Sequence, residues 1–417
     1  IKSFEKALNL AHILGDKKNE GKWHGSIGIS YSRMWNQKLA LKNFEDALKI
    51  AVETGDKNSQ GRWYGNMGIA YSKLGKEIEA IKVTHRALSI TEETKDKNNH
   101  SRWLGSIVSP YSQMGLQSEA LAFGFKALDL AKDIHDRRRE GGCLGNIGLV
   151  YSKSGDETKA LDFFLKALEI ADEIKDEVNK GRWLTHLPII YFNLGDVGNA
   201  LKVCQLGLQK TKKNEDKFNY GKGLLSLGEI YYAINISQAK FAKFLNELKE
   251  LALEIDSDLL LCYYHYFDAR NYLLKGNFEQ YKKSYKEVEK KLKKVDSREI
   301  HIQAMLVNLQ YFRVTKNLKK AHETYEQIIE LLKKCEFFYL RLETIYQNAL
   351  VKKDEGLISE AQQIIEEEIH FARMRGYKLF LKKALKLDIE LKQMLNISSD
   401  IDMINLKRLE KELDGLR

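Results

Sequence analysis

A string of eleven residues returns along this chain at multiples of 40 positions. It reads GRWYGNMGIAY at residues 61–71, GKWHGSIGISY at residues 21–31 and GGCLGNIGLVY at residues 141–151. A fixed period of this length indicates an array of repeated units, each of which buries its apolar face against its neighbours. The period constrains the fold more than the length of 417 residues does, since length alone would suggest two or three globular domains.

Each unit is predicted to contain two helices. In the unit built around Trp63, the first helix is expected over residues 58–74 and the second over residues 77–94. Gly75 separates them, because glycine adopts the left-handed conformation that ends a helix. An aspartate at the start of each unit can accept hydrogen bonds from the free N–H groups of the first helix. These aspartates are Asp16, Asp56, Asp96, Asp136, Asp176 and Asp216.

The apolar positions of the first helix form one stripe at helical spacing, which predicts a buried face. In the unit around Trp63 the stripe consists of Trp63, Met67, Ala70, Tyr71 and Leu74. Tryptophan recurs in this stripe, and the recurring residues are Trp23, Trp63, Trp103 and Trp183. A row of tryptophans could stack a ligand, but its place in the apolar stripe favours core packing.

Two other faces complete the first helix. The small residues Gly65 and Gly68 form one of them, which is expected to lie close to Ala80 and Ala87 of the second helix. The remaining face carries Arg62, Asn66, Ile69 and Lys73, which are not part of the apolar stripe. Pro110 and Pro188 fall inside predicted first helices. Interior proline removes a hydrogen bond and kinks a helix. They either change the shape of the array locally or reflect drift in a degenerate repeat.

Beyond Tyr231 the string fades, but the period continues after a shift of one residue. Gly276, Lys316 and Gly356 occupy equivalent turns, and an amphipathic helix follows each. The sequence therefore predicts three parts: a regular array over residues 1–235, which starts in the second helix of a unit, about four divergent hairpins over residues 236–396, and a C-terminal capping helix over residues 397–417. The alignment of residues 1–11 with residues 41–51 leads us to expect that the chain is a fragment of a longer protein.

Composition excludes several classes of function. The formal net charge is +10, but both signs are spread along the chain, which disfavours nucleic-acid and membrane partners. The lysine-rich segment 282–294 has apolar residues at helical spacing and is interpreted as a repeat helix. The four cysteines show no CxxC spacing, so no metal site is expected, and a cytoplasmic location fits best. No HExxH, P-loop or GxSxG motif is present, so no catalytic residue or cofactor is expected.

The glycines and tyrosine of the first helix, with the two alanines of the second, resemble the tetratricopeptide repeat (TPR). The 40-residue length and the string Leu144-Gly145-Asn146 resemble the longer repeats of the Leu-Gly-Asn type. The resemblance implies an all-α, right-handed superhelical solenoid of helical hairpins. It also implies that the first helices line a concave groove that binds a peptide or an extended segment.

Residues on the remaining face of each first helix are therefore the candidate partner-binding residues of the groove. They are Lys22, Ser26, Ile29, Arg33, Arg62, Asn66, Ile69, Lys73, Arg102, Ser106, Gln113, Asn146, Leu149, Lys153, Arg182, His186 and Asn193. Basic residues at both edges with aliphatic residues between them suit a protein or peptide with acidic and apolar side chains. Alternatively, these arginines and lysines pair with carboxylates of the neighbouring unit.

Two functions are compatible with this sequence. The first is a non-enzymatic scaffold for protein–protein interaction that binds an extended peptide or partner segment in the concave groove. The alternative is a regulatory or sensor segment of a larger bacterial signalling protein, such as a kinase, a cyclase or an ATPase-type regulator.

Overall fold

The computed structural model describes residues 1–415, and within this range every element of regular structure is a helix. The first half of the array contains α1 (Lys2–Ile13), α2 (Lys17–Arg33), α3 (Gln37–Glu53), α4 (Lys57–Lys73), α5 (Glu77–Glu93), α6 (Lys97–Gln113), α7 (Gln117–Asp133), α8 (Arg137–Lys153), α9 (Glu157–Glu173), α10 (Glu177–Leu184), α11 (Leu187–Asn193), α12 (Val197–Lys213) and α13 (Lys217–Ala233). The second half contains α14 (Gln238–Glu254), α15 (Asp258–Leu274), α16 (Phe278–Leu292), α17 (Arg298–Val314), α18 (Leu318–Leu332), α19 (Phe338–Asp354), α20 (Ile358–Met374), α21 (Lys378–Met394) and α22 (Asp400–Gly415). The all-α repeat architecture expected from the sequence is thereby confirmed.

The local signals of the sequence set the helix ends. Asp56 accepts a 3.0 Å hydrogen bond from the backbone N–H of Ser59, and Asp96 accepts the equivalent bond from Asn99 at 3.0 Å. Asp16, Asp136, Asp176 and Asp216 cap their helices in the same way. Gly75 ends α4 with a φ of 74°, a conformation that glycine adopts without a steric penalty.

The small face of the first helix contacts the next unit, which the sequence did not predict. A Cβ atom on Gly65 would lie 2.3 Å from the ring of Trp103, and one on Gly145 would lie 2.5 Å from the ring of Trp183. Gly68 does face the second helix of its own unit, at Ala80 and Thr84. The expectation for Gly65 was therefore wrong: a tryptophan of the following unit fills the space that its missing side chain leaves. Trp63, Trp103 and Trp183 are buried, as expected of a core column.

The two prolines have different effects. Pro110 lies inside α6, which stays continuous, whereas Pro188 separates α10 from α11. The broken helix approaches α12 closely at Gly207, where an added Cβ would lie 2.8 Å from the backbone carbonyl of Leu184. The earlier units carry alanine at the position of Gly207. The proline and the glycine thus occur in the same unit and together change the position of its first helix.

The one-residue shift of the period is located in the turn between α13 and α14. Four residues separate these helices, whereas three separate α11 from α12 and α15 from α16. After this turn the first helices α15, α17, α19 and α21 begin 40 residues apart. Gly276, Lys316 and Gly356 end their helices with positive φ, at the equivalent turns read from the sequence. At the end of the described chain, α22 packs on α21 through Leu409 and Leu413.

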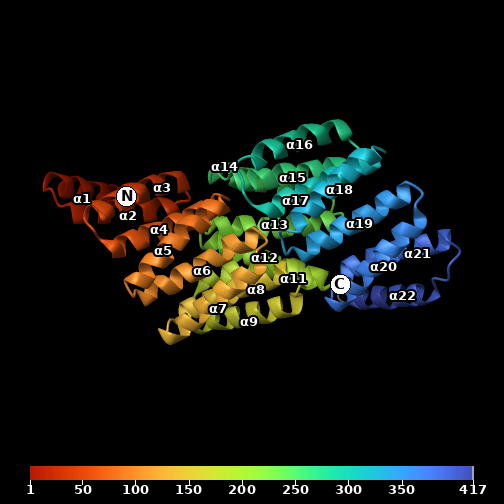
Figure 1. The fold of residues 1–417 in the computed structure, drawn as a ribbon, viewed down its shortest axis with the longest axis horizontal. Helices are drawn as coiled ribbons and strands as arrows, with labels where there is room; N and C mark the ends of the chain where they lie inside the picture. Colours follow the sequence, from red (N-terminus) through yellow and green to blue (C-terminus); the bar gives the residue numbers. More distant parts are fainter. Residues whose placement is uncertain (416–417) are drawn as a thin grey trace.

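The array turns back on itself, so that units far apart in sequence lie side by side (Figure 1). The backbone N–H of Asp296 donates a 2.8 Å hydrogen bond to the carbonyl of Gly75, and Glu336 bonds to Gly115 in the same way at 2.8 Å. We call this line of contact the seam. It joins the turns at residues 75 and 115 to the linkers at residues 296 and 336, and it joins Glu157 to Tyr377. The units at the two ends of the chain lie at opposite ends of the long axis (Figure 1).

Candidate functional site

The curvature of the array forms a central cavity of about 780 Å³, which is partly open to solvent. First helices form nearly all of its wall, since α6, α8, α10, α11, α13, α15, α17, α19 and α21 each contribute side chains. The seam completes one side of the cavity wall, because it brings α17, α19 and α21 opposite α6 and α8. A volume of this size is typical of sites that enclose a small molecule or a short segment.

One position of the first helix recurs around the cavity wall. It is the position that Arg62 and Arg102 hold in their units, which the sequence analysis named as a candidate. After α13 the same position is reached in 41 residues instead of 40, because the turn before α14 is one residue longer. Six successive members line the cavity, and they are Arg182, Lys222, Tyr263, Gln303, Glu343 and Lys383. We call these six residues the inner column. The repeat therefore places a different side chain at each step around the cavity while it keeps the backbone constant.

Three ion pairs link neighbouring or opposite helices across the wall. Arg270 donates to Glu229 at 2.7 Å, which joins α15 to α13. Lys383 pairs with Glu343, which joins α21 to α19. Lys153 of α8 pairs with Glu299 of α17, and this pair connects the two halves of the array. The lining contains five Lys and Arg side chains and three carboxylates, so two positive charges remain without a carboxylate partner.

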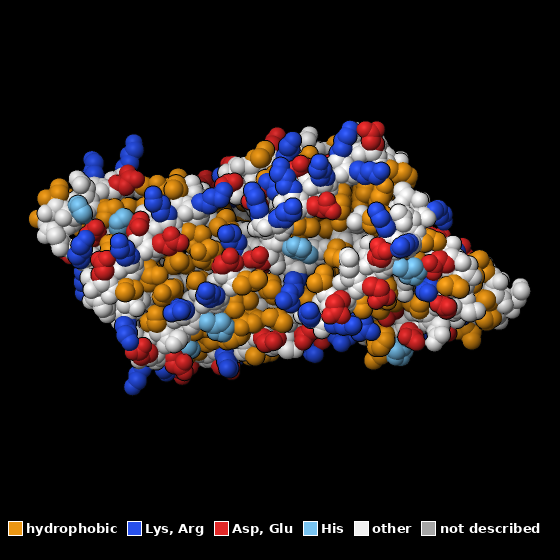
Figure 2. Space-filling view, turned by 45° about the horizontal axis from the view of Figure 1, so that its top comes forward, with side chains coloured by type: hydrophobic (Ala, Val, Ile, Leu, Met, Phe, Trp, Pro, Cys, Tyr) orange, Lys and Arg blue, Asp and Glu red, His pale blue; other side chains and the backbone are white. Residues whose placement is uncertain are grey.

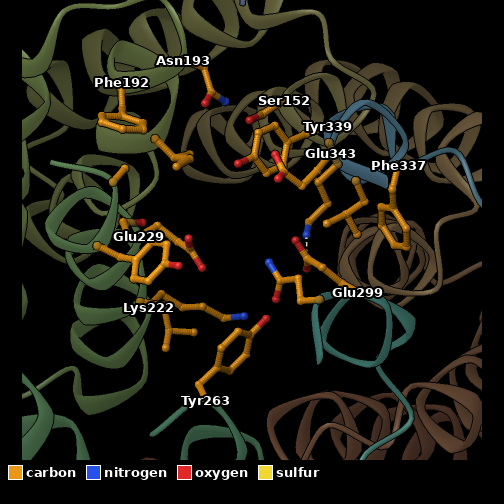
Figure 3. Close-up of a pocket in the computed structure, with 18 of the residues that line it drawn as sticks. Ser152, Phe192, Asn193, Lys222, Glu229, Tyr263, Glu299, Phe337, Tyr339 and Glu343 are labelled. Carbon is orange, nitrogen blue, oxygen red and sulfur yellow. Dashed lines mark hydrogen bonds and ion pairs between the residues drawn. The ribbon is translucent and has the colours of Figure 1, made fainter. Parts of the chain in front are cut away.

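The two remaining cations are Arg182 and Lys222. Arg182 donates a 2.8 Å hydrogen bond to the side chain of Asn146 and lies over the ring of Trp183 at 4.3 Å. Lys222 lies over the ring of Phe218 at 5.5 Å and makes no hydrogen bond or ion pair with any residue from 1 to 415. Burial lowers the pKa of both side chains from their usual values. In Figure 3 the amine of Lys222 and the carboxylate of Glu229 point toward the open middle of the cavity.

His186 lies beside these cations, at the break between α10 and α11. Its pKa is well below the usual value for histidine, because burial and the positive charges of Arg182, Lys222 and Lys153 disfavour protonation. The ring is therefore neutral at physiological pH, and it stacks on Phe164 with ring centroids 5.9 Å apart.

Aromatic side chains form the wall opposite the break. Tyr263, Tyr266 and Phe267 come from α15, and Tyr339 comes from α19. Arg270 lies 3.6 Å from the ring centroid of Tyr232, so even a charged member of the wall presents one face to an aromatic ring. The wall thus offers flat apolar surface beside fixed polar groups, a combination that suits a ligand with side chains of both kinds.

The structure separates the candidate residues of the sequence into two groups. Gln113, Leu149, Lys153, Arg182, His186 and Asn193 line the central cavity. The others lie outside its lining, and they are Lys22, Ser26, Ile29, Arg33, Arg62, Asn66, Ile69, Lys73, Arg102, Ser106 and Asn146.

Several residues of the second group have structural partners. Arg102 donates a 3.3 Å hydrogen bond to Asn66, the same arrangement that joins Arg182 to Asn146. Lys73 lies 4.3 Å from the ring centroid of Trp35, and burial lowers its pKa to about 8. Arg102 and Arg182 thus bond to an asparagine of the preceding unit rather than to the carboxylate that the alternative interpretation of the sequence supposed.

Most of the cavity wall comes from residues that the sequence analysis did not name as candidates. Arg270, Gln303 and Glu343 belong to the units in which the repeated string has faded, whereas Lys222 and Glu229 lie in its last copy. A signal for them does exist in the sequence. Continuing the column of Arg62 at steps of 40, with one step of 41 after Lys222, leads to every member of the inner column.

No group of three or more His, Cys, Asp and Glu side chains in residues 1–415 is arranged to hold a metal ion. Across the same range, every helix is too short or too polar to cross a membrane. Lysine and arginine alternate with aspartate and glutamate over the face shown in Figure 2, as the sequence suggested.

Comparison with known proteins identifies the repeat. The family model of the tetratricopeptide repeat matches residues 142–173, in α8 and α9. No curated protein matches the chain in sequence.

Similar solved structures include NprR in complex with its cognate peptide NprX, at 18% identity and a TM-score of 0.56, covering 70% of this chain and 82% of NprR. A Rap protein complexed with competence and sporulation factor has 17% identity and a TM-score of 0.55, covering 68% of this chain and 77% of that protein. The Rap conjugation gene regulator of the plasmid pLS20, in complex with the Phr* peptide, has 16% identity and a TM-score of 0.55, with coverage of 68% and 77%. At these identities the likeness concerns the fold. Together with the match to α8 and α9, it shows a helical-repeat fold of the tetratricopeptide type.

Proposed function

We propose that this protein is a non-enzymatic binding protein that holds an extended peptide in its central cavity. One observation carries the proposal: the inner column lines the central cavity with two cations, an aromatic ring, an amide, a carboxylate and a third cation in succession. A peptide presents backbone amides and varied side chains at regular intervals, and a wall built from repeats can match them in the same order.

The comparisons support this proposal. NprR and both Rap proteins were solved with a bound peptide or factor, and their fold resembles that of this chain. We further propose that the units are 40-residue repeats of the Leu-Gly-Asn type, as the string at residues 144–146 suggests. The absence of CxxC spacing among the cysteines supports a cytoplasmic location.

A blocked cavity provides the test. Ser109 lines the cavity on α6, and Ile29 holds the same position of its unit on α2, outside the lining. Purified wild-type protein, Ser109→Trp and Ile29→Trp would each be immobilised and exposed to a pool of random heptapeptides. Mass spectrometry would then identify the peptides that each protein retains, after circular dichroism has shown equal helix content.

We expect the wild type and Ile29→Trp to retain the same subset of peptides and Ser109→Trp to lose it, because an indole at residue 109 occupies the cavity. Equal retention by Ser109→Trp would show that peptides bind elsewhere. A wild-type protein that retains no peptide above a blank surface would refute the peptide-binding function.

A further inference from the structure

The cavity contains a cluster of positive charge that the protein itself leaves unsatisfied. Lys153, Arg182 and Lys222 all influence the neutral ring of His186. Of these three cations, only Lys153 has a carboxylate partner within residues 1–415, and that partner is Glu299. Arg182 uses one N–H group for Asn146, although a guanidinium carries five.

Nearby carboxyl groups do not neutralise the two free cations. Asp216 accepts hydrogen bonds from the backbone and the side chain of Asn219 at 3.2 and 2.6 Å, as the cap of α13. Burial raises the pKa of Glu77 to about 8, so this side chain is mostly protonated at neutral pH. Glu299 is held by Lys153. Lys222 is half-buried. An ammonium that loses part of its hydration without gaining a partner is destabilised, and a bound anion would offset that cost.

An unpaired acceptor lies in the same wall. The side-chain oxygen of Gln303 is buried, lacks a hydrogen-bond partner among the described residues, and belongs to the inner column with Arg182 and Lys222. It can accept a hydrogen bond from an N–H group of a ligand. The ring of Tyr263 stands between Lys222 and Gln303 in the order of the column.

The two free cations, the unpaired oxygen of Gln303 and the ring of Tyr263 together favour a peptide carboxylate over a small inorganic anion. Inorganic phosphate would satisfy the cations but would leave the oxygen of Gln303 unpaired and the tyrosine surface uncovered. A peptide with a carboxylate supplies an anion, an N–H donor and apolar surface in one molecule. Guanidinium groups bind carboxylates with two parallel hydrogen bonds, a geometry that the free N–H groups of Arg182 allow.

We propose that Arg182 and Lys222 form an anion subsite in the central cavity that binds a carboxylate of the peptide. This inference rests on the proposed peptide-binding function and adds its chemical specificity. The partner is an acidic peptide, whose carboxylate comes either from Asp and Glu side chains or from the free C-terminus.

The test uses four heptapeptide pools, with or without Asp and Glu in the random positions, and with a free or an amidated C-terminus. They would be applied to the wild type, Arg182→Gln, Lys222→Gln and Arg102→Gln. Arg102 is a matched control, because it holds the same position of its unit, bonds to Asn66 as Arg182 bonds to Asn146, and lies outside the cavity lining.

We expect the wild type and Arg102→Gln to favour carboxylate-bearing peptides, and Arg182→Gln and Lys222→Gln to bind them about tenfold more weakly, the loss expected for one hydrogen bond to a charged group. Enrichment that follows Asp and Glu identifies a side-chain carboxylate, and enrichment that follows the free C-terminus identifies a terminal one. Equal retention of neutral, amidated peptides by the wild type would overturn the anion subsite and leave the peptide function intact.

Two other outcomes would count against the subsite. If no pool is retained by the wild type, the peptide function fails and the subsite fails with it. If inorganic phosphate alone raises the melting temperature of the wild type but not of Lys222→Gln, and also displaces the acidic peptides, the site binds free phosphate and the assignment to a peptide carboxylate is wrong.

Discussion

The hydroxyl of Tyr377 donates a 3.0 Å hydrogen bond to the carboxylate of Glu157, a residue 220 positions earlier in the chain. The bond lies at the seam, beside the cavity, and Asn193 donates a second hydrogen bond of 2.7 Å to the same carboxylate oxygen. Burial raises the pKa of Glu157 to about 7, while the hydrogen bonds from Asn193 and Tyr377 act in the opposite direction. The two halves of the array are thus joined through a carboxyl group that titrates near neutral pH.

Removing the hydroxyl of Tyr377 should weaken the seam. We expect Tyr377→Phe to lower the free energy of unfolding by about 0.5–1.5 kcal/mol, as for one intramolecular hydrogen bond. The pKa of Glu157 should rise further, because a group that lowers it is gone. Thermal unfolding at pH 6 would measure the loss. Tyr339→Phe is the control, since the Tyr339 hydroxyl makes no hydrogen bond within residues 1–415, and an equal effect of both variants would contradict the role of the bond.

Glu77 should make the stability depend on pH. Burial raises its pKa from 4.5 to about 8, and one carboxyl oxygen has no partner among the described residues. Because folding raises this pKa, its contribution to stability is complete below about pH 4.5 and is lost as the pH rises through about 8. Glu77→Gln should therefore raise the urea midpoint at pH 9 and change it little at pH 5.

The repeat itself provides the precedent for Glu77→Gln. Gln117 holds the same position in the next unit, where its amide donates a 3.0 Å hydrogen bond to the carbonyl of Ser112. Gln37 bonds to the carbonyl of Ser32 in the same way at 3.1 Å. An identical decline of stability with pH in Glu77→Gln and in the wild type would show that Glu77 is not responsible.

The contact between Gly65 and Trp103 should tolerate no added methyl group. We expect Gly65→Ala to cost about 1–3 kcal/mol, because the indole or the helix has to move. Gly105 holds the same position in the next unit, where Cys143 replaces tryptophan and the nearest atom to an added Cβ is its sulfur at 3.8 Å. Gly105→Ala should raise the stability by up to about 1 kcal/mol, since alanine favours helix. Similar melting temperatures for the two variants would contradict the packing described.

Gly207 and Pro188 should be energetically coupled. Gly207→Ala should destabilise the protein by about 1–3 kcal/mol, because its Cβ would overlap the backbone at Leu184. In a Pro188→Ala background, α10 and α11 can join, and the same substitution should cost less. A double-mutant cycle from denaturant unfolding measures this difference. Strict additivity would show that the proline does not cause the close approach.

The sequence alone was sufficient to predict the ends of the helices. The first helix expected over residues 58–74 is observed as Lys57–Lys73, because Asp56 and Gly75 define its ends through contacts within a few residues. The contact of Gly65 with the following unit was not foreseen, because a column of glycines does not reveal which neighbour fills the space. The break at Pro188 and the continuity at Pro110 could not be told apart, since the difference depends on how α12 packs.

The cavity depends on contacts that no local pattern encodes. Each unit is rotated slightly relative to the one before it, and these rotations add up to the curvature of the array. This curvature brings Glu157 to Tyr377 and Gly75 to Asp296. The sequence pointed to the face that carries Arg182, but it did not show where along the array that face becomes enclosed. Lys222 and Gln303 could be predicted as cavity residues only by extending the column of Arg62 through units whose other positions had diverged.

The seam joins positions of the chain that are a nearly constant number of residues apart. Its partners are separated by 220 or 221 residues, or about five and a half units, so a turn inside one unit always meets a linker between two others. Gain or loss of a whole 40-residue unit would exchange each seam contact for another of the same kind. Gain or loss of a single helix would set turn against turn and linker against linker. A chain built in this way can change its length only in whole units if it is to keep a closed cavity.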